Sequence, residues 1–217
     1  SEFSQYADGA DYMTYIVLGS ALNVLAVSTL MNIGRALITE LREGTLEMLL
    51  LAPASRNLYF LGCLLEQTTR ALIEFVTVLL AGAALGAKLG DLLSFRAFFA
   101  ILLAVFGFFC MGIFLSGVML YTRDTYITQN TLFITMSLIC GIAYPIQYLP
   151  KWVQCFAQIF PLTPAVTLFR NIVTGRQYLA DNIWLILQVF GLSGIYLAAG
   201  LLWNRWLERR MIESIFG

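Results

Sequence analysis

Long apolar runs separated by short polar stretches dominate the pattern along this chain. A helix that crosses the hydrocarbon core of a membrane needs roughly 20 consecutive, mostly apolar residues. Runs of this kind predict membrane-spanning helices at about residues 12–34, 58–87, 95–121, 127–144 and 183–203. The sequence therefore predicts an all-α fold, a single polytopic membrane domain of about five transmembrane helices over residues 1–217.

Composition supports a membrane protein and argues against several other classes. Of the 217 residues, 59% are hydrophobic and 12% are charged, whereas about 25% of an average soluble domain is charged. The 13 basic and 13 acidic residues balance, so no basic excess indicates a nucleic-acid partner. The chain has no histidine, the commonest general base and metal ligand. We therefore expect no catalytic site, no metal site and no nucleic-acid binding.

Loop charges predict the orientation in the membrane, because basic residues are more frequent on the cytoplasmic side. If the first loop faces the cytoplasm, that side holds seven basic residues and the other side five. The cytoplasmic set is Arg35, Arg42, Arg56, Arg123, Arg205, Arg209 and Arg210. The outer set is Lys88, Arg96, Lys151, Arg170 and Arg176. We therefore expect segment 40–56 inside and segment 145–176 outside.

A short amphipathic helix is predicted within that first cytoplasmic loop. Thr45 can cap it, Glu47 suits its positive N-terminal end, and Pro53 lies just beyond its last turn. Three leucines share one face by their i, i+3, i+4 spacing: Leu46, Leu49 and Leu50. The helix could lie on the lipid headgroups or dock into a groove of a cytoplasmic partner.

This loop reads Glu40-Leu-Arg-Glu43-Gly44-Thr45-Leu46-Glu47-Met-Leu-Leu-Leu-Ala-Pro53. Its order of charged residues, Gly, Thr, Leu, Glu and Pro resembles the signature loop of the type-2 ABC transporter permeases, the membrane subunits of many bacterial exporters. The resemblance implies that the segment is a coupling helix seated on an ATPase subunit. The residues carried over to this role are Glu43, Gly44, Thr45, Leu46, Glu47 and Pro53.

A second apolar stretch, residues 145–176, lies between the last two predicted spans. Its prolines and Gly175 predict two short helices, at about residues 150–160 and 164–174. We expect them to dip into the outer leaflet, where protein shelters irregular backbone. Similar re-entrant helices, with Tyr-Leu-Pro before them and Pro-Leu-Thr-Pro within, occur in the type-2 ABC permeases. The residues that mark this segment are Pro150, Trp152, Pro161, Pro164 and Arg170.

Three charged residues lie in the first half of the second predicted span. Glu66, Arg70 and Glu74 follow i, i+4, i+8 spacing and so share one helix face. A charge in hydrocarbon costs at least ~2.5 kcal/mol on insertion scales. Either this half of the helix lies in the headgroup zone or cytosol, or the face lines the cytoplasmic mouth of a transport pathway.

The resemblance implies a permease subunit of an ABC exporter in the cell (inner or plasma) membrane, moving an amphiphilic, lipid-linked, polysaccharide or drug-like substrate outward. No GxxxxGK[ST] sequence occurs, so the chain is not expected to be an enzyme, and ATP and Mg would belong to a separate ATP-binding cassette subunit. We also expect membrane lipid and a second permease copy as partners, most simply a homodimer, with a heterodimer as the alternative. The alternative function is a secondary transporter or channel without an ATPase.

One feature departs from the family pattern. The family usually has six spans, and its signature loop follows the second of them, whereas here the loop follows the first predicted span. Either another span precedes Ser1 in the full protein or the topology differs. We expect the former, and hence six spans in the full chain.

Overall fold

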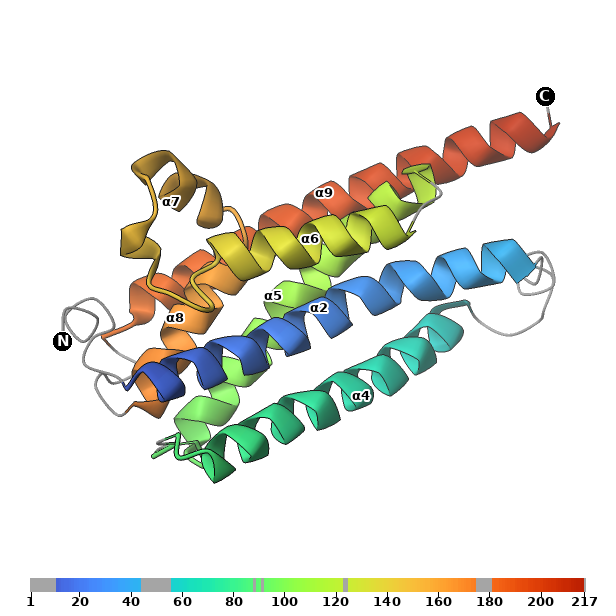
Figure 1. Ribbon diagram of the computed structural model, residues 1–217. Helices are drawn as coiled ribbons and strands as arrows, with labels where there is room; N and C mark the ends of the chain where they lie inside the picture. The colour runs from blue at the N-terminus through green and yellow to red at the C-terminus, as the bar shows by residue number, and fades with distance from the viewer. Residues whose placement is uncertain are drawn as a thin grey trace.

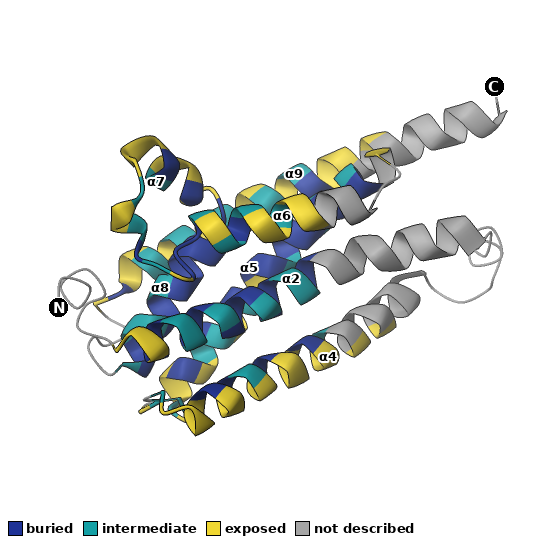
Figure 2. Ribbon diagram, in the orientation of Figure 1, coloured by how far each residue is buried: buried dark blue, intermediate teal, exposed yellow. Residues whose placement is uncertain are grey.

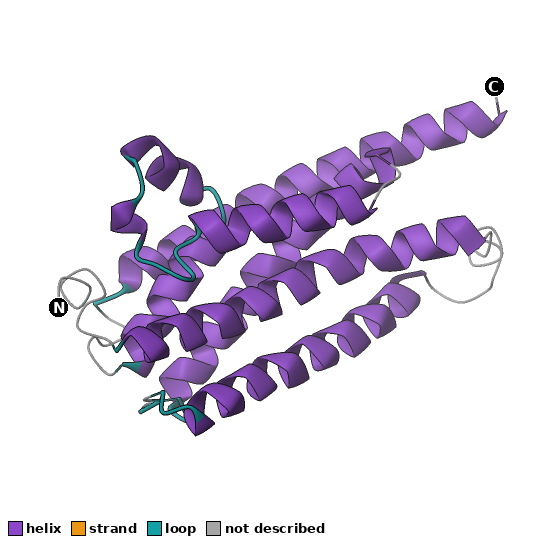
Figure 3. Ribbon diagram, in the orientation of Figure 1, coloured by secondary structure: helices purple, strands orange, loops and turns teal. Residues whose placement is uncertain are grey.

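The regular elements of this protein are helices throughout the part of the chain that the computed structural model describes, residues 11–43, 56–87, 89–90, 92–122, 125–174 and 181–216. In chain order they are α2 (Tyr12–Glu43), α4 (Arg56–Ala84), α5 (Phe95–Thr122), α6 (Thr125–Ile139), the 3-10 helix η1 (Ile146–Tyr148), α7 (Lys151–Ala157), α8 (Leu162–Val173) and α9 (Ile183–Phe216). The predicted all-α class is therefore confirmed (Figure 3).

Among the described residues, three helices contain a stretch long and apolar enough to cross a membrane by itself: Tyr12–Leu30, Phe95–Met119 and Ile183–Trp203. The pair α7 and α8 passes the same test jointly, with a bend of 88° at the break between them. Helices α4 and α6 occupy the two other places where spans are predicted, but α6 has only 15 residues and the first half of α4 carries charges. The chain thus forms a polytopic helical bundle, as predicted.

The long helices lie in a row in the order α4, α2, α5, α9. The most extensive contacts join α5 to α9, α5 to α2 and α2 to α4, while α6 packs mainly on α2. Figure 1 shows α7 standing off one end of this row, beside the end where α2 begins. Helix α8 packs on α2, α5 and α9 at the same end. The hairpin of α7 and α8 is therefore built onto one end of the bundle.

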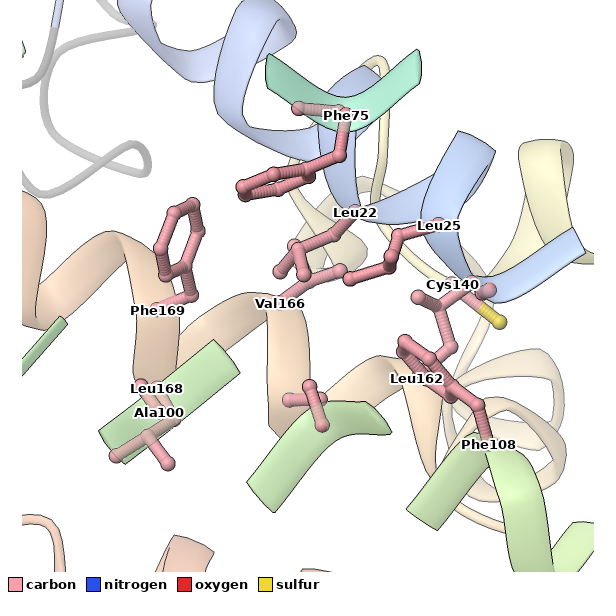
Figure 4. Packing of buried hydrophobic residues seen from close by; sticks show 14 of the residues in the cluster. Leu22, Leu25, Phe75, Ala100, Phe108, Cys140, Leu162, Val166, Leu168 and Phe169 are labelled. Atoms are coloured by element: carbon pink, nitrogen blue, oxygen red, sulfur yellow. The ribbon is translucent and has the colours of Figure 1, made fainter. Parts of the chain in front are cut away.

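Helix α8 supplies much of the core. Nine of its 12 residues are buried, and Figure 4 shows several of them meeting side chains of α2, α4 and α5. Phe169 of α8 packs on Phe75 of α4 with 5.9 Å between the ring centroids. Lipid tails are as apolar as these side chains, so close packing and interhelical hydrogen bonds, rather than transfer from water, hold such helices together.

Burial falls off from the middle of the row to its edges (Figure 2). Within the spanning stretches, 67% of the α2 residues are buried but only 17% of the α9 residues. Helix α4 likewise exposes large apolar side chains such as Ile73 and Leu80 along its outward face. The outer faces of α4 and α9 are therefore the surfaces that this chain offers to lipid or to other membrane subunits.

Several helix boundaries differ from the predicted ones, and α7, for example, ends at Ala157 and not at about residue 160. Two of the differences have a local cause. The span predicted over residues 127–144 ends at Ile139, because Gly141 adopts the left-handed conformation (φ +72°) that stops a helix before Pro145 is reached. Helix α8 begins at Leu162, with Pro161 as its N-cap. Pro164 therefore lies in its first turn, where a missing N–H costs no helical hydrogen bond.

The close contact between α9 and α5 can be tested at a glycine. A Cβ added at Gly200 would lie 2.8 Å from the backbone N of Phe114, whereas nothing lies within 4 Å of a Cβ added at Gly194, on the same helix. Gly200→Ala should therefore destabilise the protein by about 1–3 kcal/mol through overpacking. Gly194→Ala should be neutral or stabilising by up to ~1 kcal/mol, because alanine favours helix. Thermal unfolding of both purified variants measures the difference in stability. Equal stability of Gly200→Ala and Gly194→Ala would contradict this packing.

Candidate functional site

The predicted coupling segment, residues 40–56, overlaps the last residues of α2 and the first residue of α4. Helix α2 has 32 residues and ends at Glu43, so at ~1.5 Å per residue it is roughly 48 Å long, longer than the roughly 30 Å hydrocarbon core. Its membrane-spanning stretch ends at Leu30. The other predicted coupling residues lie outside the described residues: Gly44, Thr45, Leu46, Glu47 and Pro53. Helix α2 therefore leads without a break from the membrane to the start of this segment.

The charged face predicted on the second span lies on α4. Glu66, Arg70 and Glu74 are all exposed on this chain. The Glu74 carboxylate accepts a hydrogen bond of 2.6 Å from the Ser28 hydroxyl of α2. This bond holds one end of the charged face against α2. Glu66 and Arg70 are exposed at the surface of the chain.

Helices α7 and α8 are the two short helices predicted within segment 145–176, with Pro150 as the N-cap of α7 and Pro161 as that of α8. Inside the turn, the Thr163 hydroxyl donates a 2.6 Å hydrogen bond to the carbonyl of Ala157. Trp152 of α7 is 75% exposed, in contrast to the buried α8. The hairpin therefore has one half inserted in the bundle and one half at its surface.

Arg170, near the end of α8, joins three separate parts of the chain. Its Nη1 donates to the Gly141 carbonyl at 2.7 Å. Its Nη2 donates to the carbonyls of Tyr15, at 2.9 Å, and Ile142, at 2.8 Å. The guanidinium also lies over the Tyr15 ring, 3.5 Å from its centroid, an arrangement in which the ring face attracts the cation. We call these four residues, Tyr15, Gly141, Ile142 and Arg170, the Arg170 cluster.

Two glycines make the Arg170 cluster possible. Gly141 turns the chain after α6, so its carbonyl and that of Ile142 accept from Arg170 instead of continuing the helix. A Cβ on Gly19 of α2 would overlap Nη2 of Arg170 and lie 2.6 Å from the Ile142 carbonyl oxygen. The cation is thus partly buried among main-chain oxygens, and its Nε is buried with no hydrogen-bond partner in the part of the chain that the structure describes.

Sequence reasoning placed Arg170 in the hairpin but missed its partners. Tyr15, Gly19 and Gly141 lie inside apolar runs, where each is unremarkable by type. The sequence did contain one signal for these contacts, an arginine within the apolar stretch 145–176. A charge near the membrane requires a polar partner. That signal identifies a need for acceptors but does not say which residues supply them.

Helix α2 also holds α6 and α4 through polar side chains. Asn23 Nδ2 donates a 3.1 Å hydrogen bond to the Ser137 hydroxyl of α6, in addition to the bond between Ser28 and Glu74 of α4. The Asn23 Oδ1 atom is buried and has no partner among the described residues. Hydrogen bonds between membrane helices contribute about 0.6 kcal/mol on average, so these contacts position the helices more than they stabilise them.

Replacing Arg170 tests the cluster. Arg170→Met keeps an apolar stem of similar length but leaves three carbonyls without their donor, at about 1 kcal/mol or more for each lost bond. We expect a loss of roughly 2–5 kcal/mol in the free energy of unfolding. The stability of Arg170→Lys should lie between those of the wild-type protein and Arg170→Met, because an ammonium cannot reproduce the planar fork of the guanidinium. Denaturation of the purified variants measures the effect, with Lys151→Met as the control because Lys151 is exposed. If both Met variants are equally stable, the cluster does not hold α8.

Comparison with known families found a match. The family model described as ABC-2 type transporter matches residues 3–174, a range that contains α2, the coupling segment, α4 to α8 and the Arg170 cluster. No curated protein matches the chain. The match covers more than half of the 217 residues and agrees with the resemblance seen in the first loop. The chain therefore belongs to the ABC-2 type transporter family, and it is a membrane permease of that type.

Proposed function

We propose that this permease is the membrane subunit of an ABC exporter in the cell (inner or plasma) membrane. The observation that supports the proposal is the match to the ABC-2 type transporter model over residues 3–174. The sequence contains no GxxxxGK[ST] loop with which to cradle ATP. Under this proposal, ATP and Mg are bound by a separate ATP-binding cassette subunit, and an amphiphilic, lipid-linked, polysaccharide or drug-like substrate moves outward.

Coupling to that ATPase is assigned to the segment after α2. In the proposal Glu43, Gly44, Thr45, Leu46, Glu47 and Pro53 form or flank a helix that docks on the ATPase. A push on this segment would be passed to α2, which has no break between Tyr12 and Glu43. At its other end α2 supplies Tyr15 to the Arg170 cluster. The same helix would therefore link the ATPase to the hairpin of α7 and α8. Switching between inward and outward access would then follow as a rigid-body motion.

The pathway in this proposal runs between two copies of the permease, most simply a homodimer. The outer faces of α4 and α9 are unburied on the single chain, and so each is available for a second copy or for lipid. Glu66, Arg70 and Glu74 would lie at the cytoplasmic mouth, where water reaches the charges and lowers the cost of placing them near the membrane.

Topology can be tested by labelling single cysteines with a thiol reagent that does not cross membranes. In a background without the four native cysteines, Gln177→Cys should be labelled in intact cells and Ser55→Cys should not. The reason is that the basic residues favour a cytoplasmic first loop. Permeabilised cells provide the control, because both positions should then react. Labelling of position 55 but not 177 in intact cells would reverse the orientation and remove the coupling segment from the cytoplasm.

Coupling can be tested at Glu43 and Gly44. Removing one partner of a buried, hydrogen-bonded charge costs about 2–5 kcal/mol, so Glu43→Ala should lower transport-linked ATP hydrolysis by at least about tenfold. Gly44→Val should act in the same direction by blocking a close approach. Membrane insertion should be retained in both variants. The matched control is Glu208→Ala, which removes a carboxylate from the last part of α9, outside the coupling segment.

Co-purification with the ATPase separates docking from signalling. If the ATPase is lost from Glu43→Ala, the segment anchors it, and if the ATPase is retained but unstimulated, the segment transmits the motion. Normal ATPase binding together with normal transport in both variants would show that the segment is only a membrane-surface helix.

A further inference from the structure

A small pocket lies between the hairpin and α9, away from the coupling segment and the charged face of α4. Its volume is about 220 Å³, below the roughly 300–1,000 Å³ of sites for drug-sized ligands. It therefore suits a single ring or a small headgroup. The lining residues are Ile146, Gln147, Gln154, Gln158, Thr163, Pro164, Thr167, Leu185 and Gln188.

The described lining of this pocket is uncharged. Six of its nine residues are glutamine or threonine, and none of the nine is acidic or basic. The Gln154 amide already donates to the Leu149 carbonyl at 2.7 Å, and the Thr167 hydroxyl donates to the Thr163 carbonyl at 3.0 Å. The Thr167 hydroxyl and one N–H of Gln154 are thus directed into the protein. The side-chain oxygens of both residues remain as acceptors, and the second N–H of Gln154 remains as a donor.

Three further amides are not committed to the fold. The side chains of Gln147, Gln158 and Gln188 make no hydrogen bond within the part of the chain that the structure describes. Each offers two donors and a carbonyl acceptor. Gln147 and Gln158 are exposed and Gln188 is half-buried. The described lining therefore presents donors and acceptors together and no charged group.

The pocket also lies at the depth where lipid headgroups are expected. Gln188 is near the start of α9, one turn after Trp184, which is 74% exposed. Trp152, at the start of α7, is 75% exposed. Exposed tryptophans are typical of the interface between membrane and water, and Figure 1 places α7 at one end of the bundle. A headgroup in that zone can reach the pocket without leaving the bilayer.

We propose that this pocket binds an uncharged polyhydroxyl group, a single sugar ring or a glycerol. Each hydroxyl both donates and accepts, which matches amides that offer both functions. The described lining residues offer no cation to pair with a phosphate and no carboxylate to pair with an ammonium. The apolar side chains of Ile146, Pro164 and Leu185 suit the C–H surface of a ring. The group can come from a glycolipid of the bilayer or from a free saccharide, and neither source depends on the ATPase.

The test uses the full-length protein in nanodiscs without ATP or ATPase, so its outcome is independent of the coupling proposal. The nanodiscs contain glucosyl-diacylglycerol and phosphatidylcholine with the same acyl chains. Native mass spectrometry of the released protein measures the ratio of the two lipids retained, with and without free glucose in the buffer. The test variant is Gln158→Leu with Gln188→Leu, and the control is Asn130→Leu, which removes an exposed amide from α6.

The wild-type protein and the Asn130→Leu control should retain the glycolipid above its proportion in the nanodisc. The double variant should lose about thirtyfold of this preference, since two hydrogen bonds are removed at about 1 kcal/mol each. If free glucose leaves the ratio unchanged, the site takes a lipid headgroup, and if glucose displaces the glycolipid, the site also takes free saccharide. No preference in the wild-type protein, or an equal preference in the double variant, would overturn the proposal. An unchanged unfolding temperature shows that the double variant is folded.

Discussion

The arrangement of the end of the bundle that carries α7 and α8 depends on the Arg170 cation and the main-chain oxygens around it. Arg170 is held by the carbonyls of Tyr15, Gly141 and Ile142 and by the face of the Tyr15 ring. Carbonyl dipoles can stabilise a partly buried cation without placing a second charge near the membrane, where each charge is costly. The consequence is that the position of α8 in the bundle is tied to α2 and to the turn after α6.

This dependence makes α2 the element that joins the two ends of the bundle. Near its N-terminus the helix contributes to the Arg170 cluster, further along it is hydrogen-bonded to α6 through Asn23 and to α4 through Ser28, and it continues unbroken to Glu43. A displacement of its C-terminal end would therefore act on several helices together. A transporter that alternates between two arrangements benefits from such a stiff element, because packed helices shift as units and not by gradual bending.

Lipid as the surrounding solvent explains why polar contacts occupy the inside of the bundle and apolar side chains cover its edges. Between helices in a membrane there is little transfer free energy to gain, so small residues and hydrogen bonds decide which faces meet. Gly200 allows α9 to approach the backbone of Phe114, whereas the rest of α9 is largely exposed. The uncharged amides between the hairpin and α9 differ from these apolar surfaces. This difference supports the proposal that the pocket is a binding site.

The sequence by itself determined the helices, because the length of an apolar run and the positions of proline are local properties. The sequence was enough to predict the all-α membrane fold, the break at Pro161 and the family that the first loop resembles. Only the tertiary structure decided where α6 ends and what Arg170 contacts. Tyr15 and Arg170 are 155 positions apart, and no local pattern encodes a pairing over that distance. Such pairings arise when helices pack, since packing selects which of many similar apolar faces come together.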